Sequence, residues 1–310
     1  MTRDLLSLRD LSAAEIHGIL DEAVRLKGLR KQGVPHPLLA GKSLGMVFEK
    51  SSTRTRVSFE VGMYELGGHA LFLNPRDLQL GRGEEIRDTA RVLSRYVHGV
   101  MIRAYRHTTL EEYARYSDVP IVNGLSDREH PCQVLADLLT LRERFGSLEG
   151  LRVAWVGDGN NVCNSLILSA AATGIQVAVA TPRGYQPDPA IVAASREGGG
   201  KVTLTTEPAK AVKDADAVYT DVWVSMGEEE ERAKRLRAFR GYAVTEDLLA
   251  SAADRAIVLH CLPAHRGEEI TDGVLEGPAS AVWDQAENRL HAQKALLVRL
   301  LGGTSPEGRV

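Results

Sequence analysis

The chain has 310 residues, of which 44% are apolar and 25% charged, a composition typical of globular proteins and a length sufficient for two domains. Its formal net charge of −3 gives no sign of general nucleic-acid binding. No stretch approaches the roughly 18 uninterrupted apolar residues of a membrane span, and the first residues lack the apolar core of a signal peptide. The three cysteines have neither a disulfide nor a metal-ligand spacing, so we expect a cytoplasmic protein with reduced thiols.

The first half of the chain alternates predicted strands and helices. Apolar runs predict strands at 44–48, 70–73, 99–104 and 120–123. Apolar residues at helical spacing predict helices at 11–29, 86–97, 110–116 and 130–145. A further helix follows residue 52, where Val57, Val61 and Tyr64 form the repeat and Gly67-Gly68 provides the C-terminal cap. The polar stretch 74–83 is expected to be a mobile loop.

The second half repeats this alternation after the composition changes at 146–150. Strands are expected at 151–157, 176–180, 201–205, 217–220 and 256–260, with helices at 162–173, 190–197 and 285–300. Strands that alternate with helices predict an α/β protein with two doubly wound domains, each with a central parallel sheet flanked by helices. Ligands of such sheets bind at the carboxyl ends of the strands.

The stretch Ser52-Thr53-Arg54-Thr55 lies where the first predicted strand leads into a helix. A helix N-terminus offers unpaired backbone N–H groups and a partial positive charge. The hydroxyls and the arginine would complete a site for a small anion, most simply phosphate. A serine-threonine pair alone is more often only a helix cap, so the functional interpretation depends on the longer string.

Two further positions in the first half carry polar side chains suited to a ligand. Arg103 ends an apolar strand, so its guanidinium is expected to point into a cleft and to bind a phosphate or carbonyl oxygen. His130 and Gln133 are three residues apart and share one helix face, where they would donate to a carbonyl oxygen and accept from an amide. The alternative is a histidine near a helix start beside a solvated glutamine.

The stretch Gly157–Asn161 resembles the start of a dinucleotide-binding fingerprint, which raises the alternative of a dehydrogenase. The third glycine is missing, and the next strand ends in Ala180-Thr181-Pro182 without an acid for a ribose hydroxyl. A strand–loop–helix unit with Asn161 exposed is better suited to a small polar substrate.

Polar groups also follow the later strands. Asp221 and Ser225 could together bind an ammonium group, and the backbone N–H of Met226 could bind a carboxylate. Cys261 stands between His260 and Leu262-Pro263 at the end of another strand. A lone cysteine at such a position is usually a small buried apolar residue, and the acid alone could simply cap a loop.

These motifs, taken together, resemble the aspartate and ornithine carbamoyltransferases. The matching blocks are Ser-Thr-Arg-Thr at 52–55, His-Pro-x-Gln at 130–133, Asp-x-Trp-x-Ser-Met-Gly at 221–227, His-Cys-Leu-Pro at 260–263 and Glu-Asn-Arg at 287–289. They stand in family order from about residue 2 to residue 301. The aspartate enzymes carry proline where Cys261 stands and lack the Ser-Met-Gly block, so the resemblance is to the ornithine enzymes.

The resemblance implies transfer of the carbamoyl group of carbamoyl phosphate to the δ-amino group of L-ornithine, giving L-citrulline and phosphate, without metal or cofactor. Arg54, Arg103, His130, Asp221 and Cys261 would be the catalytic residues. The carbamoyl phosphate site would comprise Ser52, Thr53, Arg54, Thr55, Gln79, Arg103, His130, Gln133, Cys261, Leu262 and Arg289. The ornithine site would comprise Asn161, Asp221, Ser225 and Met226, with Cys261 beside the δ-amine.

The family also implies an architecture. Residues 1–145, completed by the helix at 285–310, would bind carbamoyl phosphate, residues 146–284 would bind ornithine, and the active site would lie in the cleft between them. Gln79 would reach the site of a neighbouring subunit in a homotrimer or a multiple of it, with no nucleic-acid or membrane partner.

Several points stay open at this stage. The amine must lose a proton, and the acceptor could be Cys261 or Asp221, or the amine could bind already neutral. Putrescine or N-acetylornithine could replace ornithine, and a catalytically silent homologue is a further alternative. We expect a role in arginine biosynthesis, although the residues do not distinguish it from arginine breakdown.

Overall fold

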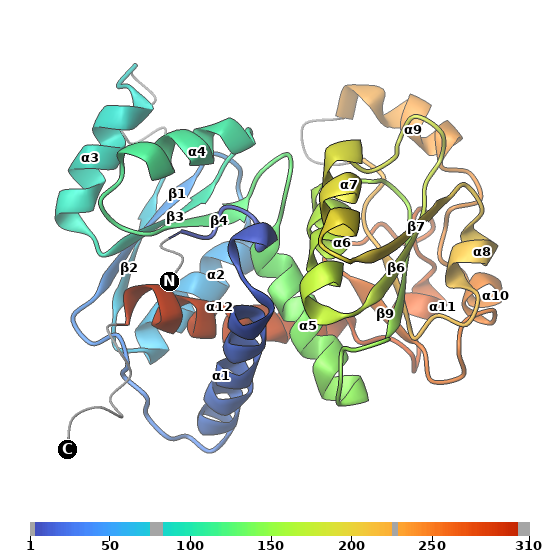
Figure 1. The fold of residues 1–310 in the computed structure, drawn as a ribbon, viewed down its shortest axis with the longest axis horizontal. Coiled ribbons are helices and arrows are strands. Elements are labelled where there is room, and N and C mark those ends of the chain that lie inside the picture. The colour runs from blue at the N-terminus through green and yellow to red at the C-terminus, as the bar shows by residue number, and fades with distance from the viewer. Residues whose placement is uncertain (1–3, 75–82, 225–228, 303–310) are drawn as a thin grey trace. The chain divides into compact units, whose positions relative to one another are not determined.

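The computed structural model describes residues 4–74, 83–224 and 229–302. Its contacts divide the chain into two compact units, Met1–Leu139 with Asn288–Val310, and Thr140–Glu287. The chain passes between the units within two helices, α5 (Pro131–Phe145) and α12 (Val282–Leu301) (Figure 1). The composition change that suggests a boundary near residue 145 coincides with the last residue of α5.

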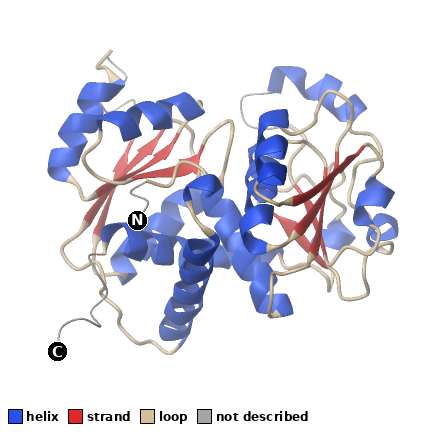
Figure 2. Cartoon of the chain, viewed as in Figure 1, coloured by secondary structure: helices blue, strands red, loops and turns tan. Residues whose placement is uncertain are grey.

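The first unit is built around a parallel sheet, which has four strands in the described residues, in the order β2-β1-β3-β4 (Figure 2). Its strands are β1 (Ser43–Phe48), β2 (His69–Leu73), β3 (Gly99–Arg103) and β4 (Ile121–Leu125). The helices that accompany them are α1 (Ala13–Lys31), α2 (Thr53–Glu65), α3 (Ile86–Tyr96) and α4 (His107–Tyr116), and a 3-10 turn, η1 (Leu8–Asp10), precedes α1.

The core of the first unit explains the positions of its helices. Ala90 of α3 and Tyr113 of α4 pack in one buried cluster with Ile102 of β3, so these two helices cover one face of the sheet. Helix α2 buries Phe59 and Met63 instead of the repeat that predicts it. Val57 and Tyr64 are 49% and 80% exposed, so the repeat correctly predicts the helix but not its buried face.

The second unit has a parallel sheet of five strands within the described residues, in the order β7-β6-β5-β8-β9. The strands are β5 (Arg152–Val156), β6 (Gln176–Ala180), β7 (Lys201–Thr205), β8 (Ala217–Thr220) and β9 (Ile257–His260). The helices are α6 (Asn161–Thr173), α7 (Pro189–Glu197), α8 (Pro208–Val212), α9 (Arg232–Ala238), α10 (Glu246–Leu249) and α11 (Asp272–Leu275), and the 3-10 turn η3 (Glu229–Glu231) precedes α9.

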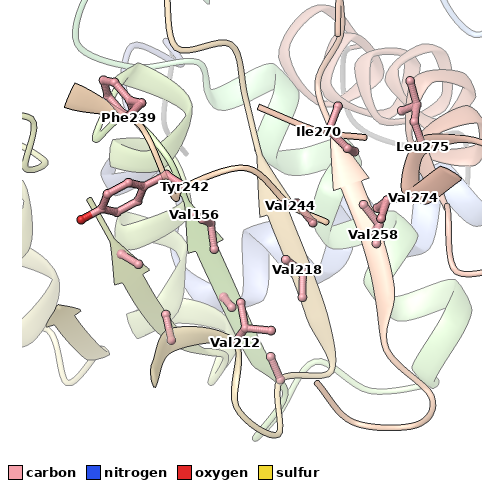
Figure 3. Close-up of a cluster of buried hydrophobic side chains, with 14 of the residues drawn as sticks. Val156, Val212, Val218, Phe239, Tyr242, Val244, Val258, Ile270, Val274 and Leu275 are labelled. Atoms are coloured by element: carbon pink, nitrogen blue, oxygen red, sulfur yellow. The ribbon is translucent and has the colours of Figure 1, made fainter. Parts of the chain in front are cut away.

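One face of this sheet carries an apolar core, to which β5, β8 and β9 all contribute side chains. Figure 3 shows Val156 of β5, Val218 of β8 and Val258 of β9 among the side chains of this cluster. Phe239 and Ile270, both fully buried, pack against them from the connecting segments. Valine suits a parallel strand covered on both faces, and burial of each such side chain contributes about 1.5–3 kcal/mol. This core fixes the ends of β5, β8 and β9, which carry the polar residues described below.

The predicted fold class is confirmed, because two parallel sheets flanked by helices are present. The nine predicted strands each overlap an observed one among the described residues. Helices α8 to α11 were not predicted, because their four to seven residues are too few for a helical repeat to be recognised. In the described part of the chain, no helix is long and apolar enough to cross a bilayer.

Candidate active site

The anion-binding stretch lies at the N-terminus of α2, immediately after β1. Ser52 is the N-cap, and its hydroxyl accepts the backbone N–H of Thr55 at 3.3 Å and donates to the Thr55 hydroxyl at 3.1 Å. The first turn of α2 contains no acidic residue, and Thr53 is exposed while Arg54 is half-buried. The free N–H groups of this turn and the adjacent cation therefore suit a small anion.

Strand order places Arg103 near this helix start. β1 and β3 are neighbours, yet the chain proceeds from β1 to one edge of the sheet and from β3 to the other. Ligands of open parallel sheets bind at such a switch point. Phe48, the last residue of β1, is in register with Arg103, the last residue of β3. The guanidinium thus comes from the strand end beside the one that leads into α2.

Arg289 of α12 connects three elements of the first unit. It is 3% exposed and donates to the Gln133 side-chain oxygen at 2.7 Å and to the Thr55 hydroxyl at 3.2 Å. The Gln133 amide donates in turn to Asp137 at 2.9 Å. Gln133 therefore fixes Arg289, and its oxygen retains a second lone pair for a ligand amide.

His130 lies at the start of α5, buried among cations. Burial is the main cause that lowers its pKa well below the usual range, and the charges of Arg289, Arg103 and Arg54 lower it further. The three arginines come from α12, β3 and α2, so different elements bring their charges to one imidazole. His130 is consequently neutral at physiological pH and available as a hydrogen-bond donor in an electropositive site.

The second unit has its own switch point, between β5 and β8. Asp221 directly follows β8, and its carboxylate accepts the Asn160 side-chain amide at 2.7 Å. Asn160 is also the N-cap of α6, where its oxygen accepts the backbone N–H groups of Val162 and Cys163. The sequence interpretation named Asn161, the first residue of α6, and missed Asn160. The Asn-Asn pair was the signal available in the sequence, and the contact of Asn160 with Asp221 depends on the backbone at the start of α6.

Cys261 contacts the same carboxylate. β8 pairs with β9, with Thr220 opposite His260, so the next residue of each strand lies side by side. The thiol of Cys261 donates to Asp221 Oδ1 at 2.9 Å, and this oxygen also accepts the backbone N–H of Val222. The acid is 6% exposed, whereas the cysteine is half-buried. The two groups thus form a thiol–carboxylate pair at the ends of two neighbouring strands.

Three of the predicted site residues, Gln79, Ser225 and Met226, lie outside the described residues. The remaining ones divide between the units. The first unit contains Ser52, Thr53, Arg54, Thr55, Arg103, His130, Gln133 and Arg289, and the second contains Asn161, Asp221, Cys261 and Leu262. Each unit therefore carries a half-site of distinct character, cationic in the first and acidic in the second.

Within the described residues, two groups bring three potential metal ligands within 4.8 Å of one another, namely Asp221 with His260 and Cys261, and His265 with Glu268 and Glu269. Hydrogen bonds already engage part of both groups, although His265 Nδ1 and Glu269 Oε2 have no hydrogen-bond partner among the residues that the structure describes. Both ring nitrogens of His260 have partners, and Glu268 forms an ion pair with Arg232.

Comparison with known proteins also divides the chain into two binding domains. The chain belongs to the aspartate/ornithine carbamoyltransferase family, since the model of its carbamoyl-P binding domain matches residues 3–143 and that of its Asp/Orn binding domain matches residues 149–300. Within this family, the ornithine carbamoyltransferase of Methanoculleus marisnigri is 67% identical over 303 residues, 98% of either chain. The structure of the ornithine carbamoyltransferase of Pyrococcus furiosus has a TM-score of 0.94 at 55% identity and covers 98% of both chains.

The Thermus thermophilus ornithine carbamoyltransferase is a further solved relative. It has a TM-score of 0.88 and 46% identity, and the match covers 97% of this chain and 99% of that one. The family resemblance inferred from the motifs is thereby confirmed.

Proposed function

We propose that this protein is an ornithine carbamoyltransferase, which converts carbamoyl phosphate and L-ornithine to L-citrulline and inorganic phosphate. The observation that carries the proposal is the contact of Asp221 with Cys261 at the ends of two neighbouring strands. A carboxylate there attracts an amino group and repels a second carboxylate, which favours ornithine over aspartate. The near full-length identity to ornithine carbamoyltransferases supports the same substrate.

The first half-site binds carbamoyl phosphate in this proposal. The phosphate lies at the start of α2, against Ser52, Thr53, Arg54 and Thr55, where N–H groups and a guanidinium neutralise its charge. Arg103 and His130 donate to the carbamoyl oxygen, and Gln133 and Arg289 contact the carbamoyl group. Since these donors are positioned before the reaction, they stabilise the oxyanion that develops as the amine attacks.

The second half-site binds ornithine. Asp221 accepts from an amino group of the substrate, and Asn161, Ser225 and Met226 hold its remaining α-substituents. Asn160 joins this set, because its amide already orients the Asp221 carboxylate. Cys261 and Leu262 contribute their backbone to the carbamoyl group, with the Cys261 thiol beside the δ-amine.

The amine must lose a proton before or during attack. An alkylamine has a pKa of about 10.4, so its neutral form costs about 4.6 kcal/mol at pH 7. As the N–C bond forms and the C–O bond to phosphate breaks, the proton passes to the thiol–carboxylate pair. Because the Cys261 thiol already donates to Asp221 Oδ1, the accepted proton can be shared between the two side chains. Phosphate is a good leaving group and needs no strong acid.

We further propose the domain organisation expected from the sequence. Residues 1–145 with 285–310 form the carbamoyl phosphate domain, residues 146–284 form the ornithine domain, and the substrates meet in the cleft between them. The family-model matches at 3–143 and 149–300 support a boundary near residue 145, and the grouping of Asn288–Val310 with Met1–Leu139 supports adding the C-terminal helix to the first domain. Arginine biosynthesis in the cytoplasm stays part of the proposal, since L-citrulline is the product.

A homotrimer or a multiple of it is the proposed assembly, with Gln79 completing the site of a neighbouring subunit. Mixing Gln79→Ala subunits with Arg54→Ala subunits tests this arrangement. Mixed assemblies should regain activity, because some shared sites then have both residues intact. Sedimentation of a fully active monomer at assay concentration would contradict the proposal.

The decisive assay offers carbamoyl phosphate with ornithine, putrescine, N-acetylornithine or aspartate, and measures the carbamoylated product and phosphate. Ornithine should have the highest kcat/KM, by about 10²-fold or more, since the other amines lack a charge that this site binds or add one that it repels. A preference for putrescine or N-acetylornithine would replace the substrate assignment. No turnover with any amine would favour a catalytically silent homologue.

A further inference from the structure

A buried glutamate with no role in the proposed chemistry contacts the loop that follows β9. Glu269 is fully buried, and its Oε1 atom accepts the backbone N–H of His265 at 2.6 Å. The same oxygen lies 3.0 Å from Nε2 of His260, the last residue of β9, whose side chain is also fully buried. The carboxylate therefore contacts both ends of the segment 260–265.

The other nitrogen of the His260 ring determines where its proton lies. Nδ1 lies 2.8 Å from the backbone N–H of Leu262, which can only donate. Nδ1 must therefore be the acceptor and carry no proton, so the ring is neutral and its single proton is on Nε2. That proton is donated to Glu269, so the carboxylate fixes both the tautomer and the orientation of the ring.

The backbone that this ring holds is unusual. Leu262 has a φ of +59°, in the left-handed region that residues with a side chain rarely adopt. Such a conformation persists where the surroundings enforce it, and it often occurs at a functional site. Because the Leu262 N–H is bound to His260, the orientation of the backbone at Cys261 and Leu262 depends on this imidazole.

We propose that Glu269 is a positioning residue of the carbamoyl-transfer reaction, acting through His260 on the backbone of Cys261 and Leu262. The proposal rests on the proposed function, in which this backbone contacts the carbamoyl group. Glu269 itself touches no substrate. It holds the imidazole that holds the Leu262 N–H, and so directs the two carbonyl oxygens and the adjacent thiol toward the reacting atoms.

The contacts distinguish this role from simple packing. Oε2 of Glu269 is buried without a hydrogen-bond partner and lies 3.8 Å from His265 Nδ1. A glutamine at this position would supply the same acceptor oxygen without a buried charge, so Glu269→Gln should fold at least as stably as the wild type. Glu269→Ala removes the acceptor and leaves the His260 proton without a partner.

The kinetic test uses two pairs of matched variants. Asparagine in place of His260 presents an oxygen near the position of Nδ1, whereas glutamine presents its amide near the position of Nε2. We expect Glu269→Ala and His260→Gln to lower kcat by about tenfold or more, the usual effect of losing an outer-shell partner. Glu269→Gln and His260→Asn should retain most of the wild-type kcat, and KM for ornithine should change little in all four variants.

The double variant His260→Asn/Glu269→Ala separates positioning from stability. With asparagine already bound to Leu262, loss of the carboxylate should cost no further kcat, so the two effects should be non-additive. A lowered Tm with wild-type kcat in the folded Glu269→Ala enzyme would overturn the proposal. Equal losses in His260→Asn and His260→Gln would also overturn it.

A spectroscopic test is independent of activity. In protein labelled with ¹⁵N-histidine, the signal that disappears in His260→Asn identifies His260 among the nine histidines. The wild type and Glu269→Gln should show a neutral ring protonated at Nε2, and Glu269→Ala a mixture of tautomers. A wild-type ring protonated at Nδ1 would refute the relay. If the wild-type ring is protonated at Nε2 but the enzyme transfers no carbamoyl group to ornithine, the proposed function fails and the contact of Glu269 through His260 does not.

Discussion

His130 provides a sharp test of the electrostatics in the first half-site. Burial and three arginine charges lower its pKa well below the usual range, so the ring is neutral throughout the pH range of the assay. A neutral imidazole can donate a hydrogen bond to the carbamoyl oxygen, but it does not act as an imidazolium acid. We therefore expect a substitution that preserves a donor to preserve most of the activity.

The size of the effect follows from the number of donors. Arg103 and His130 both point at the same developing charge in the proposed mechanism, and loss of one preorganised donor typically costs about 2.7–4 kcal/mol, or about 10²–10³-fold in kcat. His130→Ala should show a loss of this size. His130→Gln keeps an N–H donor of similar reach and no charge, so it should lose no more than about tenfold.

The assay is the pH dependence of kcat and kcat/KM between about pH 6 and pH 9 with saturating carbamoyl phosphate. The wild type and His130→Gln should have profiles of the same shape, since no ionisation of His130 falls in this range. An acid limb with a pKa near 6.5 that is present in the wild type and absent in His130→Gln would refute the argument. Equal activities of His130→Ala and His130→Gln would show that donation is not its role.

Three further predictions concern both half-sites and the folded state. Arg54→Ala and Arg103→Ala should each lower kcat by about 10²–10³-fold with little change in KM for ornithine, and near-normal turnover at saturation would remove either residue from the site. Asp221→Asn should raise KM for ornithine and lower kcat, while Cys261→Ser should mainly lower kcat and move the alkaline limb of the pH profile; unchanged kinetics of Cys261→Ser from about pH 6 to 9 would leave that cysteine a packing role. Burial raises the pKa of Glu129 from 4.5 to about 7, so the folded state favours the neutral carboxyl group. The free energy of unfolding should therefore fall by about 3 kcal/mol as the pH rises through this interval. Urea unfolding should detect this loss in the wild type but not in Glu129→Gln.

Much of the site could be predicted because parallel sheets bring the carboxyl ends of their strands together. Arg103 and the start of α2 follow neighbouring strands, and so do Asp221 and Cys261. Each of these residues could be placed at the edge of a sheet as soon as the strand before it and the last residue of that strand were recognised. The family motifs then supplied the strand neighbours, which hydrophobic patterns do not reveal.

The remaining features depend on side-chain geometry that no pattern encodes. Arg289 and Thr55 are 234 residues apart in the chain, yet their side chains are in hydrogen-bond contact. The contact of Asn160 with Asp221 follows from the N-cap conformation of α6. Glu269 lies just beyond the His-Cys-Leu-Pro block and matches no motif, so only its contact with His260 identifies it.

The two half-sites separate the charges that the reaction must bring together. Arg54, Arg103 and Arg289 in the first unit place positive charge near the neutral imidazole of His130, and such charge repels an ammonium group. The acid and the thiol are in the second unit, where they can bind an amine and accept its proton. If each substrate bound at the other unit, both would bind less well, because the phosphate would lie near Asp221 and the ammonium group near the arginines. In the proposed mechanism, this charge pattern would therefore favour a dianionic carbamoyl donor and an amine acceptor before any contact specific to ornithine is made.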